Sequence, residues 1–292
     1  MILSKTNMSL NPIFKQQVLI AHNGNIKVRK RFAKWLYPSN AERIYERQLV
    51  KLFKELNNKT KDLLYPQLEY LVSQANSTRP DDKNLRLDLS LENNIKEIYN
   101  KTQLSYDSTI NPVVNNVTFE QAERISSYNK EQLIKVIYSA VQVNPFLSEP
   151  YLESQIKIFQ AYNASLITKL SKEQAEKMQE ILFRNLSAGQ GVKAIKKEIE
   201  KTFDISENRA RVIARDQTNK FNGNLAELRQ KEVGISQYRW STSLDERVRY
   251  THRLNEGKVF SWDNPPASTG HPGTQIRCRC TAQPRINSKM FN

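Results

Sequence analysis

The amino-acid sequence predicts an α+β protein, with a mostly α-helical N-terminal region followed by a small α+β C-terminal module that contains a short β-sheet. Apolar residues recur at three- and four-residue steps through most of the chain before Gly234, which is typical of helices with one buried face. After Gly234, short β-prone segments alternate with turn-rich segments. We therefore expect a basic helical region over residues 1–150, and a helical hairpin followed by the α+β module over residues 151–292.

The composition of the 292-residue chain excludes several protein classes. Two cysteines are too few for a disulfide scaffold, and no apolar run reaches the roughly 18 residues that a transmembrane helix needs. The N-terminus lacks the basic and apolar regions of a secretory signal. Eight glycines argue against a glycine-rich nucleotide-binding fold, and the sequence contains neither a Walker A loop nor another recognised catalytic motif.

The first long helix is expected over residues 40–75, where apolar side chains share one face. Ser39 and Asn40 are suitable residues to cap its start, and Pro66 should kink or divide it. Residues 76–84 are polar and predict a linker.

Further helices are expected where capping boxes precede apolar periodicity. Thr118 with Gln121 predicts one helix start, and Ser171 with Gln174 predicts another. The expected helices run from near residue 118 to before 144, from about 150 to 170, from 171 to 187, and over 192–202 and 206–232.

The C-terminal module is expected to contain three strands, at residues 235–243, 258–262 and 276–281. Alternation in the first strand predicts that Tyr238 and Trp240 share one face. Residues 244–254 have helical or turn character, and the composition of residues 263–275 predicts a loop.

Positive charge is concentrated near the N-terminus. The net charge is +15, and residues 1–60 hold twelve Lys or Arg against three Glu. Such a segment suits double-stranded DNA bound without sequence specificity, although a solvated basic face or a tail docked on an acidic protein would look the same. The candidate DNA-contact residues are Lys27, Arg29, Lys30, Arg31 and Lys34. Residues 207–223 allow two interpretations, a DNA-binding helix-turn-helix or a buried helix.

The C-terminal module collects the residues with the richest chemistry. His252, His271, Cys278 and Cys280 provide two imidazoles and two thiols, which are a legitimate tetrahedral zinc set. In a strand, Cys278 and Cys280 would point to the same side. The alternative is plain packing of two small buried cysteines, and no cofactor is firmly predicted beyond this candidate zinc.

A second cluster lies just before the first of these histidines. If Asp245 begins a helix, it caps that helix, and Arg249 and His252 lie three residues apart on one face. An Asp–His pair could perform general acid–base work, whereas the alternative is a structural cap and ion-pair network of Asp245, Arg247, Arg249 and His252 that ties the turn to the sheet. The candidate structural cluster of the module comprises Trp240, Asp245, Arg249, His252, His271, Cys278 and Cys280.

The order of these C-terminal features resembles the head-morphogenesis (minor head) proteins of tailed bacteriophages, the phage Mu F-like family. The resemblance covers about residues 170–284 and departs from the family pattern at Asp216-Gln217, where many members have Thr-Glu, and in a longer final loop. The matching positions are Ala214-Arg215, Asn219 or Asn222, Trp240, Asp245 with Arg249 and His252, Gly257, His271 and Cys278-Arg279-Cys280.

The resemblance implies a low-copy, portal-associated virion component that contacts DNA and influences capsid assembly, DNA packaging or ejection. Its implied partners are the portal protein and a capsid or scaffolding protein. Its implied location is the capsid interior or portal vertex, after a stage in the host cytoplasm during assembly. We expect no enzymatic activity and no membrane span.

Two other classes of function remain open on the sequence. The first is a metal-dependent hydrolase, nuclease or transferase that uses Asp245, His252, His271, Cys278 and Cys280. The second is a host DNA-binding or nuclease-like protein unrelated to phage. Modules of this family occur attached to toxin domains, but the sequence ends at Asn292, so we expect no attached toxin here.

Overall fold

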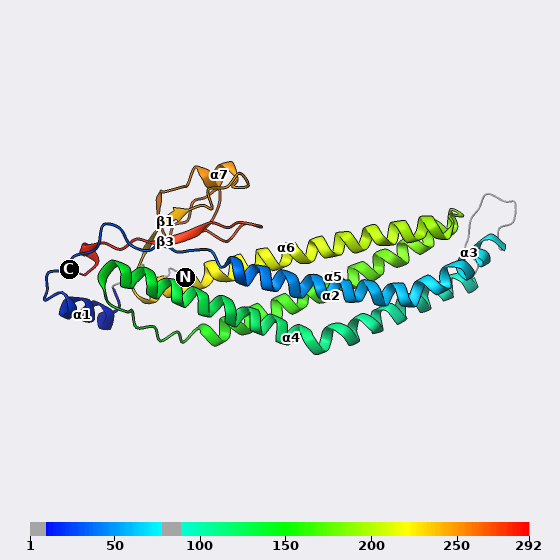
Figure 1. Cartoon of the computed structure of the whole chain (residues 1–292), viewed down its shortest axis with the longest axis horizontal. Coiled ribbons are helices and arrows are strands. Elements are labelled where there is room, and N and C mark those ends of the chain that lie inside the picture. Colours follow the sequence, from blue (N-terminus) through cyan, green and yellow to red (C-terminus); the bar gives the residue numbers. More distant parts are fainter. Residues whose placement is uncertain (1–9, 78–88, 292) are drawn as a thin grey trace, which may run out of the picture. The chain divides into compact units, whose positions relative to one another are not determined.

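A computed structural model of the chain describes residues 10–77 and 89–291 (Figure 1). Six helices precede the first strand of these described residues, and a short helix, two more strands and a 3-10 turn follow it. The helices are α1 (Pro12–Ala21), α2 (Ser39–Leu64), α3 (Leu68–Ser77), α4 (Leu89–Val141), α5 (Leu152–Ser187), α6 (Val192–Glu232) and α7 (Tyr250–Arg253). The strands are β1 (Gln237–Ser241), β2 (Val259–Ser261) and β3 (Thr281–Pro284). The predicted α+β class is confirmed.

The chain forms two compact units, each built from segments that are distant in sequence. The first unit contains residues 1–42, 120–159 and 215–292, and the second contains residues 43–119 and 160–214. The expected boundary at residue 150 does not coincide with these units, because α4, α5 and α6 each contribute residues to both. No helix among the described residues has the length and apolar character needed to cross a membrane.

The second unit is a bundle of helical segments with a buried layer of neutral polar side chains. The Tyr106 hydroxyl lies 2.7 Å from the Thr60 hydroxyl and accepts from the Gln174 amide, also at 2.7 Å. The same amide nitrogen donates to Asn57. The hydroxyls and the amide nitrogen of this layer therefore have partners within the unit, which offsets the cost of burying them.

The bundle also shows where the expected helix starts were wrong. Thr118 lies inside α4, and its hydroxyl donates to the Val114 carbonyl one turn earlier. Ser171 lies inside α5 and donates to Thr168. Both hydroxyls bond to the backbone of a continuing helix, and Gln174 serves the buried layer instead of a cap.

Other helix predictions had mixed outcomes. The division near Pro66 is confirmed, since a 3-10 turn (Tyr65–Gln67) separates α2 from α3. The break expected at residues 203–205 is absent, because α6 runs on with Phe203 buried. Most of the expected linker at 76–84 lies outside the described residues, and α3 covers its first two positions.

The first unit contains a hydrophobic core of its own. Phe14 and Val18 of α1, Trp35, and several residues of α4 and the C-terminal segment pack together there. Residues 22–38 cross this core without helical structure, with Ala33 donating to the Ser139 hydroxyl and Leu36 to the Gln132 amide oxygen. The segment that holds the basic run is therefore tied down at several points.

The three strands form one antiparallel sheet in the order β2-β1-β3. Tyr238 pairs with Phe260, and Trp240 pairs with Ala282. Tyr238 and Trp240 are buried on one face while Arg239 is exposed, as the alternation predicted. Gln230 of α6 donates to the Ala282 carbonyl and accepts from the Trp262 indole, which fixes the sheet on α6.

The third strand begins later than expected. The prediction placed it at residues 276–281, whereas β3 covers Thr281–Pro284. Arg277 has a φ of +60°, a left-handed conformation that interrupts an extended strand, and Cys278 donates back to Gln275 to close a turn. Cys278 and Cys280 therefore lie in the loop before the strand and not in it.

Candidate functional site

The site begins with a turn and a short helix that present one histidine. Asp245 accepts from the Arg247 backbone N–H and so shapes a turn, while the residue that precedes α7 is Arg249. The expectation that Asp245 caps this helix is therefore wrong, because its carboxylate bonds to the backbone two residues later. His252 lies on α7 and is only 2% exposed.

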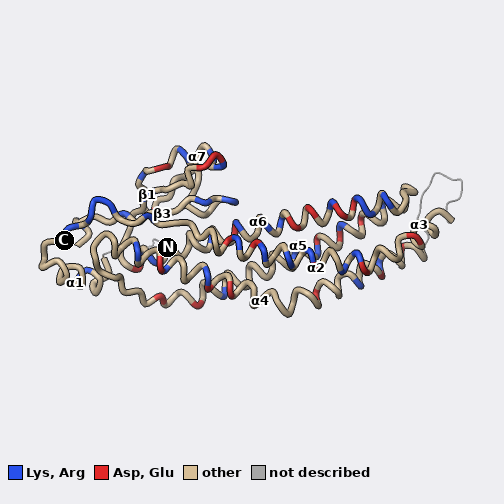
Figure 2. The backbone as a smooth tube through the Cα atoms, in the orientation of Figure 1, with Lys and Arg blue, Asp and Glu red and all other residues tan. Residues whose placement is uncertain are grey.

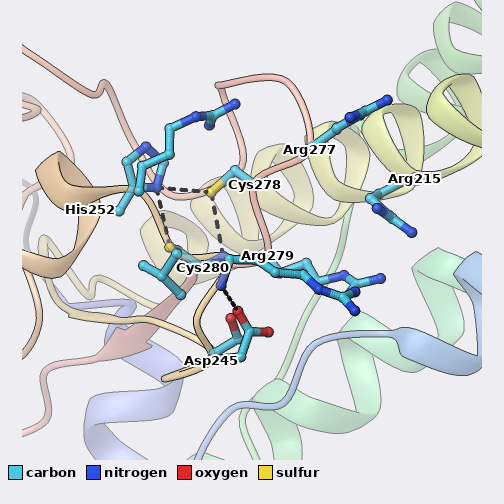
Figure 3. Close-up of a pocket in the computed structure, with 11 residues that line it drawn as sticks. Arg215, Asp245, His252, Arg277, Cys278, Arg279 and Cys280 are labelled. Carbon is cyan, nitrogen blue, oxygen red and sulfur yellow. Dashed lines mark hydrogen bonds between the residues drawn. The ribbon is translucent and has the colours of Figure 1, made fainter.

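His252 meets both cysteine sulfurs. Its Nδ1 atom lies 3.4 Å from Cys280 Sγ and 3.6 Å from Cys278 Sγ. Figure 3 shows the imidazole turned toward the two sulfurs, which come from the loop before β3. Among the described residues these three form the group whose potential metal-ligand atoms all lie within 4.8 Å of one another. The predicted convergence of two thiols and His252 is thus present without a strand.

Hydrogen bonds among Cys278, Cys280 and His252 shift the pKa values of all three side chains. The hydrogen bond from the Cys280 thiol lowers the pKa of Cys278 to about 4, and the same bond, with burial, raises the pKa of Cys280. The hydrogen bond with Cys278 also raises the pKa of His252. One thiolate is therefore stabilised beside a second thiol and an imidazole, a combination that is both nucleophilic and suited to a metal.

A second layer of polar groups orients the imidazole. Its Nε2 atom lies 2.8 Å from the Gln275 amide oxygen. Gln275 is in turn oriented because its amide nitrogen donates to the Ser268 carbonyl. Since an amide oxygen only accepts, Nε2 carries a proton, and this bond keeps Nδ1 facing the two sulfurs. Asp245 is not a partner of this ring, so the structure does not contain the Asp–His pair that was one of the two alternatives for this cluster.

His271 does not join the cluster, which corrects the four-residue zinc set. Its Nδ1 atom lies 3.0 Å from the Tyr238 hydroxyl, and its ring packs against Trp262 at 5.0 Å between centroids. Burial lowers the pKa of His271, which favours the neutral ring. The loop that carries His271 packs closely against the backbone of α6 at Gly273. A side chain at this position would not fit, because its Cβ would lie 2.9 Å from the Asn219 carbonyl oxygen. Backbone contact therefore fixes His271 away from the sulfurs.

A pocket of about 300 Å³ opens over the three converging residues. Asp245 is the carboxylate that lines it, and Trp240 packs edge-on against His252 at 5.4 Å between centroids. Five arginines complete the lining, and Figure 3 labels three of them. They are Arg215, Arg247, Arg249, Arg277 and Arg279.

Two of these arginines pair with one carboxylate that the sequence did not indicate. Glu42 is 3% exposed and accepts from Arg279 at 2.7 Å and from Arg215 at 3.0 Å. Tyr37 donates to its other oxygen. Burial alone would raise the pKa of Glu42, but the hydrogen bonds from Arg279, Tyr37 and Arg215 outweigh burial and lower it. Nothing in the local sequence around Glu42 points to the Cys-Arg-Cys segment.

A separate groove of about 700 Å³ contains much of the predicted DNA-contact segment. Lys30, Arg31 and Lys34 line it together with Arg239 and Arg285, and Glu256 is the acidic residue among its lining. We call this the basic groove. Figure 2 shows the run of Lys and Arg between α1 and α2.

The two remaining candidates for DNA contact lie just before the groove. Lys27 and Arg29 are exposed, while Ile26 and Val28 beside them pack on the core. Trp35 anchors the other end of the segment to the sheet, because its backbone N–H donates to the Gln283 side chain at 2.6 Å and its carbonyl accepts from the same side chain at 2.7 Å. The basic side chains are therefore presented from a fixed backbone.

The helix-turn-helix interpretation of residues 207–223 is wrong. The whole range lies inside α6, with Ala210 and Ala214 buried. Arg209 pairs with Glu173 and Arg211 pairs with Glu46 within the second unit. No turn separates two helices there, so the buried-helix alternative holds.

A comparison with protein-family models finds a matching family for the C-terminal part of the chain. Residues 176–283 match the family model described as Phage Mu protein F like protein. The resemblance predicted from the C-terminal motifs is thereby confirmed, and it supports a Mu F-like, phage head-related protein.

One relative extends the similarity beyond the matched range. An "Uncharacterized protein" of Haemophilus influenzae (strain ATCC 51907 / DSM 11121 / KW20 / Rd) is 28% identical over 269 residues. The alignment covers 90% of this chain and 58% of the relative, so the chain spans little more than half the relative's length. No solved structure matches.

Proposed function

We propose that this protein is a phage minor head protein, a low-copy and portal-associated virion component that contacts double-stranded DNA without sequence preference. In this role it influences capsid assembly, DNA packaging or ejection, in partnership with the portal and a capsid or scaffolding protein. The observation that carries the proposal is the basic groove, in a chain whose C-terminal part is Mu F-like.

The groove suits a phosphate backbone. Five basic side chains line it against one acidic residue, and Lys27 and Arg29 extend the same positive run. Neutralising phosphates releases condensed counterions from DNA, which supplies affinity that does not depend on base sequence. Because no helix or β-ribbon carries the Lys30–Lys34 run, we expect phosphate contact instead of base readout.

We also propose a non-enzymatic role, in preference to the hydrolase, nuclease or transferase alternative. Asp245 lines the pocket but accepts from the Arg247 backbone. Both ring nitrogens of His252 are already engaged, by the sulfurs and by Gln275. A general base must reach the proton that it abstracts, and neither group is arranged for that task.

The DNA contact is tested by salt-dependent binding of the full chain to random-sequence duplexes. Combined Lys30→Ala, Arg31→Ala and Lys34→Ala substitutions should reduce the slope of log affinity against log salt by roughly 2–3, since each lost phosphate contact removes about 0.9. The matched control substitutes Lys54, Lys193 and Lys197, three lysines of the second unit, with Ala. An equal change in both triple variants would reject the groove as the contact.

The virion role is tested in purified particles and infected or induced cells. Quantitative mass spectrometry should find a few copies of the chain per particle, and co-expressed portal protein should copurify with it. Particles that assemble and package normally without this chain would overturn the role. Cleavage of DNA that requires Asp245 and His252 would restore the nuclease alternative.

A further inference from the structure

We infer that His252, Cys278 and Cys280 form a three-ligand zinc centre, and that the fourth coordination position opens into the arginine-lined pocket and takes a phosphate oxygen. This binding site differs from the basic groove in its residues and in its chemistry. It also differs from the set of four ligands that the sequence suggested.

The two separations between the His252 nitrogen and the cysteine sulfurs already match a zinc tetrahedron. With Zn–S near 2.3 Å and Zn–N near 2.0–2.1 Å, a tetrahedral angle separates the nitrogen and sulfur ligands by about 3.6 Å. The two observed separations from His252 Nδ1 are 3.4 and 3.6 Å. All three donor atoms lie within 4.8 Å of one another, so small side-chain movements would seat a metal among them.

The surroundings prepare the donors for a metal. Gln275 holds a proton on the far nitrogen of His252 and keeps the near nitrogen facing the sulfurs, where a metal ion would displace any proton that it carries. Cys278 Sγ accepts from the Cys280 backbone N–H at 3.4 Å, a contact that favours a thiolate. Both cysteines are free of disulfide and 4% exposed. A second layer of this kind is what orients the ligands in metal sites.

The fourth position has no protein ligand within reach among the described residues. His271 is hydrogen-bonded to Tyr238, and no carboxylate of the described residues belongs to the converging group. Structural zinc sites are closed by four protein ligands, whereas sites that bind an exchangeable ligand use three. Because all three ligands line the pocket, the open position faces the pocket.

The pocket favours an oxyanion in that position. Arg215 and Arg279 are compensated by Glu42, and Arg249 donates to Gln275 and to the Ile276 carbonyl. Guanidinium forks recognise phosphate oxygens well, and zinc adds a further positive charge. These three guanidinium groups already donate hydrogen bonds to partners in the protein, so we expect the other two arginines to contribute most to anion binding.

The remaining two arginines of the lining are Arg247 and Arg277. Within the part of the chain that the structure describes, no hydrogen bond or ion pair engages the guanidinium group of either one. The left-handed backbone of Arg277 fixes the turn that presents it. Asp245 is the negative group among the lining, and its carboxylate bonds to the Arg247 backbone. The two guanidinium groups are therefore available to a phosphate.

Metal content of the purified full chain tests the three-ligand set. About one zinc per chain is expected, and His252→Ala or Cys280→Ser should remove most of it. His271→Ala is the matched control, because it removes the other imidazole of the module and should leave the zinc in place. Absence of zinc from the natural chain, or equal loss in His271→Ala, would overturn the proposal.

Cobalt substitution of the natural chain tests the open position and does not depend on a variant that folds. Tetrahedral Co²⁺ with thiolate ligands should give charge-transfer and visible bands, and inorganic phosphate should shift the visible bands. Arg247→Ala with Arg277→Ala should weaken this phosphate response about tenfold, whereas Lys193→Ala with Lys197→Ala, two exposed lysines of the second unit, should not.

Two phosphate sources can be separated in the same assay. A short DNA duplex that shifts the bands in place of inorganic phosphate would assign the position to a phosphodiester, and a response to phosphate alone would assign it to a free anion. Bands that respond to neither would overturn the open position.

Discussion

The two units bury polar groups in opposite ways. The second unit buries neutral side chains, in the layer of Thr60, Tyr106 and Gln174. The first unit buries charges. Its Arg229 is 0% exposed, and the guanidinium group donates four hydrogen bonds, to Glu149, Ser126 and Asn129. The Nη2 atom of Arg229 also lies 2.6 Å from the Glu149 carboxylate as an ion pair.

This difference indicates which unit should lose more stability when a buried polar residue is substituted. A neutral layer loses about one hydrogen bond when one member is removed. A buried ion whose partner is removed keeps its desolvation cost without compensation. The first unit holds both the thiol–imidazole cluster and the basic groove, so the unit with the candidate sites is also the unit that depends on charge pairing.

The largest expected effect is at Arg229. Arg229→Met should lower the free energy of unfolding of the first unit by about 3 kcal/mol, because the buried Glu149 keeps only Lys130 as a charged partner and Ser126 and Asn129 lose their donor. Urea titration followed by tryptophan fluorescence measures it, since Trp35, Trp240 and Trp262 all lie in the first unit.

The control for Arg229 is Arg211 of the second unit. Arg211 forms a half-exposed pair with Glu46, so Arg211→Met should cost less than about 1 kcal/mol. Equal losses in the two variants would erase the contrast between buried and exposed charge pairs.

The next effect is at Glu42. Glu42→Gln should lower the free energy of unfolding by about 2 kcal/mol, because Arg215 and Arg279 lose a charged acceptor. The same substitution should free two arginines beside the pocket and raise its affinity for phosphate. Unchanged stability in urea would mean that these arginines find other partners.

The same carboxylate makes the first unit sensitive to acid. The pKa of Glu42 is lower in the folded protein than in the unfolded chain, so its stabilisation is present above the unfolded pKa of about 4.3. That stabilisation is lost as pH falls through the folded pKa. The difference in unfolding free energy between the natural chain and Glu42→Gln should therefore shrink below pH about 4. A constant difference between neutral and strongly acidic pH would contradict this assignment.

The smallest effect is expected in the neutral layer. Tyr106→Phe should cost about 1 kcal/mol, because Thr60 still donates to Leu56 and Gln174 still donates to Asn57. Hydrogen exchange of the α4 amides around Tyr106 reports on the second unit, which lacks tryptophan. A loss as large as that of Arg229→Met would show that both units depend equally on their buried polar groups.

Local patterns predicted much of the fold. Alternation placed Tyr238 and Trp240 on one face of β1, and the Ser-Ala-Gly-Gln-Gly segment marked the end of α5. The capping boxes misled, since a Thr or Ser with a later Gln has the same sequence whether a helix starts or continues. Only the burial of residues on both sides of Thr118, such as Val114 and Ala122, decides between the two.

The sequence predicted three members of the thiol–imidazole cluster correctly and the fourth wrongly. Cys278, Cys280 and His252 lie close enough in sequence for a small module to gather them, and the order of the motifs was sufficient to indicate the Mu F-like family. His271 has the same chemistry as His252, but the seating of its loop on α6 keeps it apart. Composition does not encode that choice.

By itself, the sequence determined the helical periodicity, the small β-sheet, the basic N-terminal run and the Cys–His chemistry of the C-terminal module. Only the tertiary structure decided that three residues and not four converge, and that Glu42 neutralises Arg279 from 237 positions away. The physical reason is that periodicity and turn chemistry act between near neighbours, whereas ligand sets and buried ion pairs depend on how distant segments pack.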